Sequence, residues 1–95
     1  SDIIMDKEIS FAQAALGAEV SIETIDGDLK IRIPAGTQSG AVIRLRGKGV
    51  PDVRGSGRGD HYVRIKIVIP KGLTSRQKEL LNEFEEERKK KHTWF

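Results

Sequence analysis

The sequence contains no cysteine, and its aromatic residues are limited to one tryptophan, one tyrosine and three phenylalanines. Without cysteine, a disulfide framework, a thiolate metal site and a cysteine nucleophile are all excluded. The absence of cysteine fits a reducing compartment. We expect a cytoplasmic protein, with the mitochondrial matrix or another organelle as alternatives.

Long apolar runs are also absent, since none approaches the ~20 residues that span a bilayer. The first ten residues lack the basic start and the apolar stretch of a signal peptide. We therefore expect no membrane partner. The chain begins as if inside a strand and stops abruptly after two aromatic residues, so we expect part of a longer protein.

The composition is poor in apolar residues, at 37%, and rich in charged residues, at 33%. The 95 residues support one domain at most. A domain of this size buries only roughly 60–65% of its unfolded surface. This balance favours a thin sheet with one solvent-exposed face. Such a domain gains stability from a partner.

Neither histidine has the neighbours that catalysis or metal binding requires. His61 and His92 lie far apart, without an Asp, Ser or Cys at usable spacing, and no zinc, calcium or P-loop motif is present. The glycines that flank Lys48 and Ser56 do not complete a phosphate-binding motif. We expect no catalytic residue, no metal site and no cofactor, and therefore no enzyme.

The first residues predict a strand followed by a short helix. The strand is expected over residues 3–9. Ser10 and Gln13 have the spacing of a capping box, and Gly17 suits the position after a helix C-terminus. The apolar side of this helix would carry Phe11, Ala14, Ala15 and Leu16.

A hairpin is predicted next, because Asp26-Gly27 stands between two alternating runs and favours a type I′ turn. With a two-residue loop, Ile25 would pair with Asp28. The register would continue with Thr24 opposite Leu29, Ile22 opposite Ile31 and Val20 opposite Ile33. One face of the hairpin would carry Val20, Ile22, Thr24, Leu29, Ile31 and Ile33. This face is core by default, although part of it could remain a groove beside an exposed strand edge.

Two further strands are expected around a long glycine-rich loop. The first places Ile43 and Leu45 inward, and the second, from His61, places alternate apolar residues on one face as far as Ile69. The basic residues of this region are Arg44, Arg46, Lys48, Arg54 and Arg58. They suit a solvated loop, a phosphate-binding patch or a contact for acidic peptide. Tyr62 alone is near enough to stack on bases, so we expect no nucleic-acid partner.

The last element is a charged helix that begins after Thr74, which forms a second capping box with Gln77. Glu-to-Lys pairs four residues apart are expected to stabilise its end: Glu85–Lys89, Glu86–Lys90 and Glu87–Lys91. Its apolar side carries Leu80, Leu81 and Phe84. These three residues suit either the domain's own core or a twin subunit.

Together these elements predict a mainly β fold, a small β-sandwich of antiparallel strands with one short helix and a C-terminal helix. We expect the sandwich over residues 1–72, and a helix with a truncated tail over residues 73–95.

Several stretches in combination resemble one family. They are "ISFAQAALGAEVSIETIDG", "IPAGTQSG", "RLRGKGVP", "GDHYVRIKIVIP" and "LTSRQKELLNEFEE". Over roughly residues 3–87, the sequence resembles the second C-terminal domain of DnaJ-type co-chaperones. The resemblance implies a module that binds unfolded client polypeptides, delivers them to a 70-kDa ATP-dependent chaperone and forms a homodimer through its C-terminal helix.

The resemblance also implies site residues. Client binding would fall on Val20 and Ile22, with Ile43 and Leu45 across the groove, by analogy with a sibling domain in the family. Dimerisation would fall on Leu80, Leu81 and Phe84. The sequence lacks the His-Pro-Asp motif of a J domain, the Gly/Phe linker and the zinc-binding cysteine repeats. An alternative is therefore a structural spacer and dimerisation domain, with clients bound by the sibling domain.

Overall fold

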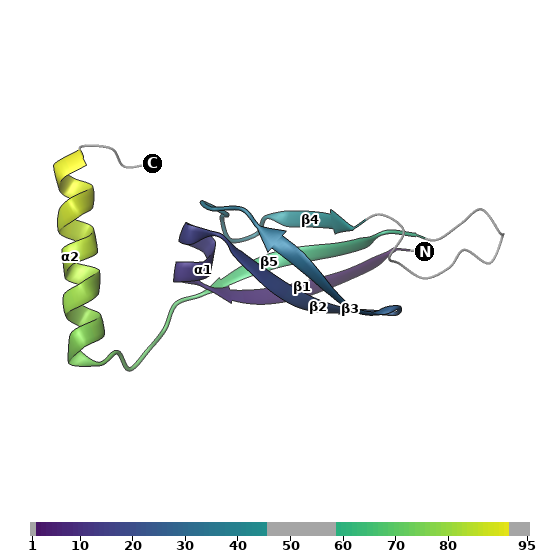
Figure 1. Ribbon diagram of the computed structural model, residues 1–95, viewed down its shortest axis with the longest axis horizontal. Helices are drawn as coiled ribbons and strands as arrows, with labels where there is room; N and C mark the ends of the chain where they lie inside the picture. Colours follow the sequence, from purple (N-terminus) through teal and green to yellow (C-terminus); the bar gives the residue numbers. More distant parts are fainter. Residues whose placement is uncertain (1, 46–58, 92–95) are drawn as a thin grey trace.

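A computed structural model of the chain describes residues 2–45 and 59–91. These residues form five strands and two helices (Figure 1). In chain order the elements are β1 (Ile3–Ser10), α1 (Phe11–Leu16), β2 (Ala18–Thr24), β3 (Gly27–Ile33), β4 (Val42–Leu45), β5 (His61–Val68) and α2 (Ser75–Lys91). None of the helices in this described part is long and apolar enough to cross a membrane.

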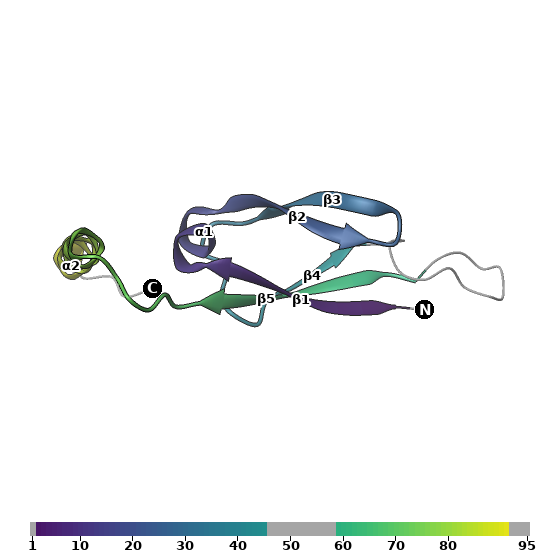
Figure 2. The same cartoon turned by 90° about the horizontal axis from the view of Figure 1, so that it is seen from below.

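The strands form two sheets that pack face to face (Figure 2). One sheet has the order β1-β5-β4, and the other is the β2-β3 hairpin. This confirms the predicted small β-sandwich with its two helices. One pairing differs from the prediction, because β1 runs parallel to β5, from Ile3 opposite His61 to Ser10 opposite Val68. Parallel neighbours need a long crossover, and here the crossover includes α1 and three strands.

The hairpin carries the predicted apolar face, but its register is shifted by two residues. Ile22 lies opposite Leu29, and Val20 lies opposite Ile31. The predicted pairing was wrong because the turn is centred on Ile25 and Asp26 rather than on Asp26 and Gly27. The Thr24 hydroxyl donates to the Gly27 carbonyl at 2.7 Å and accepts from the Asp26 N–H at 3.2 Å. A shift of two residues keeps every side chain on its face, so the hydrophobic pattern survives the error.

The core lies between the two sheets and is small. Ile33, Val63 and Ile65 are fully buried. Around them lie the other buried apolar residues, Ile9, Ala14, Ile22 and Ile31. A partly buried shell packs on this group: Met5, Val20, Leu29, Ile43, Leu45 and Ile67.

Helix α1 closes one end of the sandwich, and its capping box is confirmed. The Gln13 N–H donates to the Ser10 hydroxyl, and the Ser10 N–H donates to the Gln13 side chain, each at 3.0 Å. Of the predicted apolar side only Ala14 is buried, whereas Leu16 is 78% exposed. The helix has six residues, fewer than two turns, so it presents little apolar surface to the sheets.

Helix α2 lies beyond α1 at the same end of the sandwich (Figure 1). Its capping box is confirmed by bonds between Thr74 and Gln77 at 2.9 and 3.1 Å. The ion pairs near its end join residues three apart, not four as predicted: Arg88–Glu85, Lys89–Glu86 and Lys90–Glu87. Residues three and four apart are both neighbours on a helix, so the charge pattern alone does not choose between them.

Candidate functional site

The open side of the sandwich carries a groove of about 690 Å³ between β1 and β2. Runs of consecutive residues line it, Met5–Glu8 on β1 and Ser21–Glu23 on β2. Since side chains alternate along a strand, consecutive lining residues mean that the strand edges themselves border the groove. Among the described residues, β1 pairs only with β5 and β2 only with β3. Both edges therefore offer backbone N–H and C=O groups to an added strand.

The apolar base of the groove comes from Met5 and Ile22. Ile22 is only 2% exposed, so its side chain belongs to the core and forms part of the floor of the groove. Val20 lies on the same face of β2, partly buried against the core. Sequence reasoning did not find Met5, because β1 gave no sign that it would lie beside β2.

The other two predicted client-binding residues lie elsewhere. Ile43 and Leu45 are on β4, at the far edge of the three-stranded sheet, partly buried against the core. The structure therefore brings Val20 and Ile22 to the strand beside the groove, with β1 facing them across it. It does not bring Ile43 and Leu45 to the lining of this groove.

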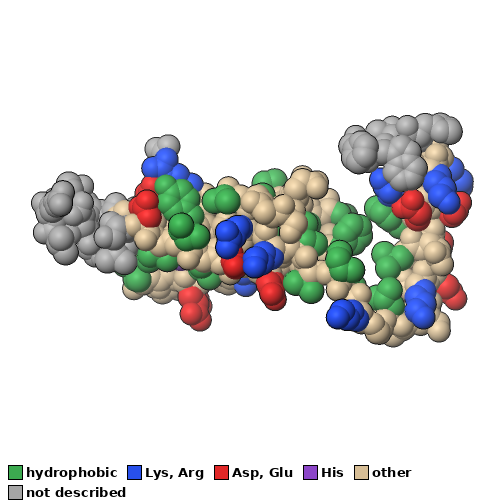
Figure 3. All heavy atoms as spheres, turned by 180° about the vertical axis from the view of Figure 1, so that it is seen from behind, with side chains coloured by type: hydrophobic (Ala, Val, Ile, Leu, Met, Phe, Trp, Pro, Cys, Tyr) green, Lys and Arg blue, Asp and Glu red, His purple; other side chains and the backbone are tan. Residues whose placement is uncertain are grey.

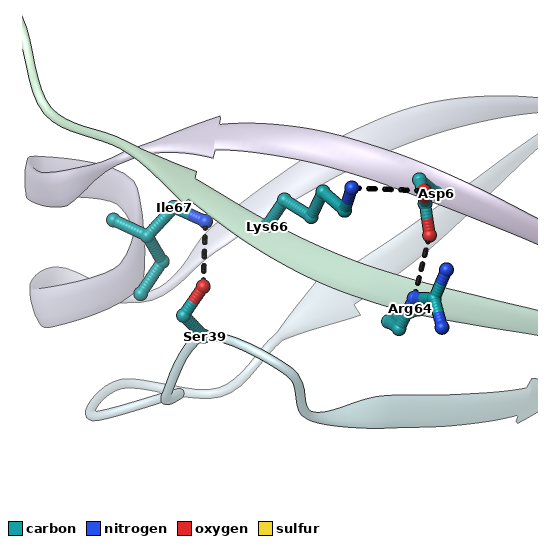
Figure 4. A network of polar contacts seen from close by, with 5 residues as sticks. All are labelled: Asp6, Ser39, Arg64, Lys66 and Ile67. Atoms are coloured by element: carbon teal, nitrogen blue, oxygen red, sulfur yellow. Dashed lines mark hydrogen bonds and ion pairs between the residues drawn. The ribbon is translucent and has the colours of Figure 1, made fainter.

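A network of charges ties β1 to β5 on the outer face of the three-stranded sheet (Figure 4). The Asp6 carboxylate accepts from Arg64 Nε at 2.7 Å and lies 3.2 Å from Lys66 Nζ. These cations, Arg64 first, hold the pKa of Asp6 below its usual value, and Asp6 in turn raises the pKa of Arg64. The network neutralises Asp6, although that residue lines the groove.

The predicted basic cluster falls almost entirely outside the described residues, since only Arg44 lies within them. Its Nε donates to Asp60 Oδ2 at 2.6 Å, and this carboxylate raises the pKa of Arg44. Arg44 is thus already engaged by an acid at the end of the sandwich. The predicted aromatic tail after Lys91 also lies outside the described residues.

A second cavity, of about 760 Å³, separates α2 from the end of the sandwich. Its walls are apolar side chains from α1, from the end of β5 and from α2, which face one another across a hollow in Figure 3. Leu80 and Leu81 line it from α2 and are 48% and 41% exposed. Phe84 is 47% exposed, and its ring meets that of Phe11. The three predicted dimerisation residues therefore lie together on an incompletely covered helix face.

Sequence reasoning missed the sandwich side of this cavity. Val68 and Ile69 line it, and Ile69 is 70% exposed rather than part of the sheet's inner face. Val68 was the available signal, because it is an apolar residue on the otherwise polar face of β5.

No metal-binding constellation appears in the part of the chain that the structure describes. There, no three His, Cys, Asp or Glu side chains gather closely enough to hold a metal ion. His61 is 2% exposed, and neither of its ring nitrogens has a hydrogen-bond partner among the described residues.

The sequence is similar to known proteins along most of its length. A family model described as the DnaJ C terminal domain matches residues 1–70. "Chaperone protein DnaJ" from an Exiguobacterium species is 57% identical over 84 residues, which are 88% of this chain and 23% of that protein. The Bacillus cytotoxicus protein of the same name is 57% identical over 82 residues, 86% of this chain and 22% of that protein. The chain thus spans less than a quarter of the length of these relatives.

Proposed function

This chain belongs to the DnaJ C-terminal domain family, and from that premise we propose that it is a non-enzymatic, client-binding module of a cytoplasmic co-chaperone. It holds extended segments of unfolded polypeptides, which the whole protein delivers to a 70-kDa ATP-dependent chaperone. The groove between the edges of β1 and β2 carries this proposal, because it combines an apolar base with strand edges that pair with no other described strand.

Strand addition to β2 is the proposed mode of binding. The client's backbone bonds to the strand edge, each bond contributing roughly 0.5–1.5 kcal/mol whatever the client's sequence. Every second client side chain points into the groove, where a buried aliphatic group contributes about 1.5–3 kcal/mol. Few such positions fit between Met5 and Ile22. Binding is therefore weak and promiscuous, as a holding module requires.

The predicted client-binding residues keep a role in this proposal. Val20 and Ile22 pack against the core and so hold β2 in place beside the groove. Ile43 and Leu45 pack against the same core from β4. A backbone-resolved NMR titration of the chain with an unfolded polypeptide tests the site. Shifts should concentrate in residues 5–8 and 21–23.

A matched pair of variants sharpens this test. Val20→Ser should weaken client binding, whereas Val42→Ser, on the far edge of β4 and 57% exposed, should leave it unchanged. Melting curves verify that both variants fold. Equal affinities for both variants, or shifts confined to α2, would remove the groove from the proposal.

We further propose that the chain forms a homodimer through α2. The half-exposed Leu80, Leu81 and Phe84 and the open cavity beside them leave apolar surface that a second copy can cover. Two weak client sites in one dimer gain apparent affinity, because the second site binds at a high effective concentration.

Analytical ultracentrifugation tests the dimer. Leu81→Asp should shift the chain to monomer, whereas Asn82→Asp, the same new residue one position along α2, should not. A monomeric parent chain at every concentration would overturn this part of the proposal.

The burial of Ile22 favours a second candidate function, a structural spacer and dimerisation domain. A stable dimer that binds no unfolded polypeptide would identify that role.

A further inference from the structure

The outer face of the β2-β3 hairpin has one unfavourable cross-strand pair. Glu19 lies opposite Arg32, which is complementary, but Glu23 lies directly opposite Asp28. Like charges at opposed positions destabilise a sheet. Neither Glu23 nor Asp28 has an ion-pair partner within 4 Å in the described part of the chain. Both line the groove. The hairpin thus holds two mutually repelling carboxylates at the groove's edge.

The facing strand adds a third carboxylate. Glu8 on β1 also lines the groove and lies opposite Lys66 in the register. The Lys66 ammonium is 3.2 Å from Asp6, however, and Glu8 has no ion-pair partner among the described residues. Lys7 is the one cation among the groove's lining residues. Three uncompensated carboxylates therefore stand against one ammonium, on the rims of a groove with two free strand edges.

We infer that this groove selects extended segments in which lysine or arginine alternates with apolar residues. The inference rests on the proposed function and adds a class of client to it. In an added strand, successive side chains point to opposite faces. When one set enters the groove above Met5 and Ile22, the other set points outward. The outward set then passes Glu23 and Asp28, where a cation relieves their repulsion.

The expected selectivity is modest and depends on salt. Each exposed ion pair changes affinity by a factor of roughly 1.4 to 5. The attraction is screened within about 10 Å at 0.1 M salt. Two or three such pairs give about tenfold preference at low salt and much less at high salt. Neutral segments still bind through backbone and apolar contacts.

Three synthetic nine-residue peptides test the inference, each alternating leucine with lysine, threonine or glutamate. Titrated into the full chain at low salt, the lysine peptide should bind about threefold more tightly than the threonine peptide and about tenfold more tightly than the glutamate peptide. Glu23→Gln with Asp28→Asn should weaken lysine-peptide binding about threefold and so remove most of its preference over the threonine peptide. This double variant should also unfold at the same or a higher urea concentration, because it removes a repulsion.

Glu79→Gln with Glu83→Gln is the matched control, since it makes the same change of charge on α2, away from the groove. If this control weakens lysine-peptide binding as much as the groove variant, net charge and not the groove is responsible, and the inference fails. If the lysine and threonine peptides bind the parent chain equally tightly, the proposed selectivity is wrong, but the client-binding proposal is not. If no peptide binds, the client-binding proposal fails together with the inference.

Discussion

The rings of Phe11 and Phe84 meet edge to face, with centroids 5.8 Å apart and planes at 87°. Phe11 begins α1 at the end of the sandwich, and Phe84 lies midway along α2. This contact joins two elements that otherwise leave a cavity of about 760 Å³ between them. The position of α2 therefore depends strongly on one aromatic pair.

Replacing either ring should loosen α2 without unfolding the sandwich. An edge-to-face pair contributes about 0.5–1.5 kcal/mol beyond its buried area. We expect Phe84→Leu and Phe11→Leu each to increase amide hydrogen exchange in α2, and the double variant to add little more. Exchange in β5 should stay constant. The measurement requires a concentration at which the chain is monomeric, and additive effects of the two substitutions would show that the rings act independently.

The core between the sheets should account for most of the stability. Ile33→Ala should cost about 2–5 kcal/mol, because it leaves a cavity at a fully buried site. Ile4→Ala is the matched control, since Ile4 is 72% exposed on β1. Urea unfolding of both variants measures the difference. Similar losses would mean that Ile4 is covered in solution.

Gly17 should tolerate substitution less well than Gly27. Its φ of 82° and ψ of 154° suit glycine alone, and an added Cβ would lie 3.1 Å from both the Ile33 carbonyl oxygen and the Ala35 nitrogen. Gly17→Ala should cost at least about 1–3 kcal/mol for the backbone strain. Gly27 also has positive φ, at 105°, but no atom of a described residue lies within 4 Å of an added Cβ. The smaller loss expected for Gly27→Ala isolates the steric contribution in urea unfolding.

Acid should weaken the network around Asp6. Arg64 and Lys66 hold the pKa of Asp6 below its ordinary 3.8. The unfolded state therefore takes up this proton first, so the stabilisation is present above pH 3.8 and is lost as pH falls through the lowered, folded-state pKa. The urea midpoint of the parent should fall more steeply below pH 3.8 than that of Asp6→Asn.

Glu8→Gln is the control for this titration, because the Glu8 carboxylate has no ion pair with the described residues. It should keep the parent's acid dependence, and high salt should reduce the difference between the parent and Asp6→Asn. Parallel curves for the parent and Asp6→Asn would contradict the assignment.

Replacing His61 with an apolar residue should increase the stability of the fold. Both ring nitrogens are buried without a hydrogen-bond partner in the described ranges 2–45 and 59–91, and each such group typically costs about 1–3 kcal/mol. His61→Leu should raise the urea midpoint, because leucine leaves no unsatisfied polar atom. His61→Gln keeps polar atoms in the same place and should give no gain. A less stable leucine variant would show that the imidazole is bonded in solution.

Local patterns in the sequence predicted the elements better than their assembly. The capping boxes at Ser10 and Thr74 and the apolar hairpin face were correct, because each depends on residues a few positions apart. The hairpin register was not, since the hydrophobic pattern has a period of two and accepts a shift of that size. The turn then depended on whether Gly27 or Ile25 shared the two central positions with Asp26, which the alternation does not specify.

The candidate groove was only half predictable for the same reason. Val20 and Ile22 follow from the hairpin, but the strand across the groove is β1, whose residues are paired with β5 from the far end of the sequence. Nothing local to Met5 or Glu8 indicates that neighbour. The α2 face was predictable because Leu80, Leu81 and Phe84 share one helical side, whereas the opposing Phe11 and Ile69 required the assembled sandwich.

The parallel pairing of β1 with β5 has a consequence for synthesis of the chain on the ribosome. Ile3 is made well before its partner His61, which follows only after the hairpin and β4 have emerged. Contacts between residues so distant in sequence form slowly, because a long loop must close before they stabilise anything. Until then the nascent segment carries an unpaired apolar strand, which is open to aggregation. While it is being synthesised, a domain proposed to bind the unfolded chains of other proteins would thus itself need protection from aggregation.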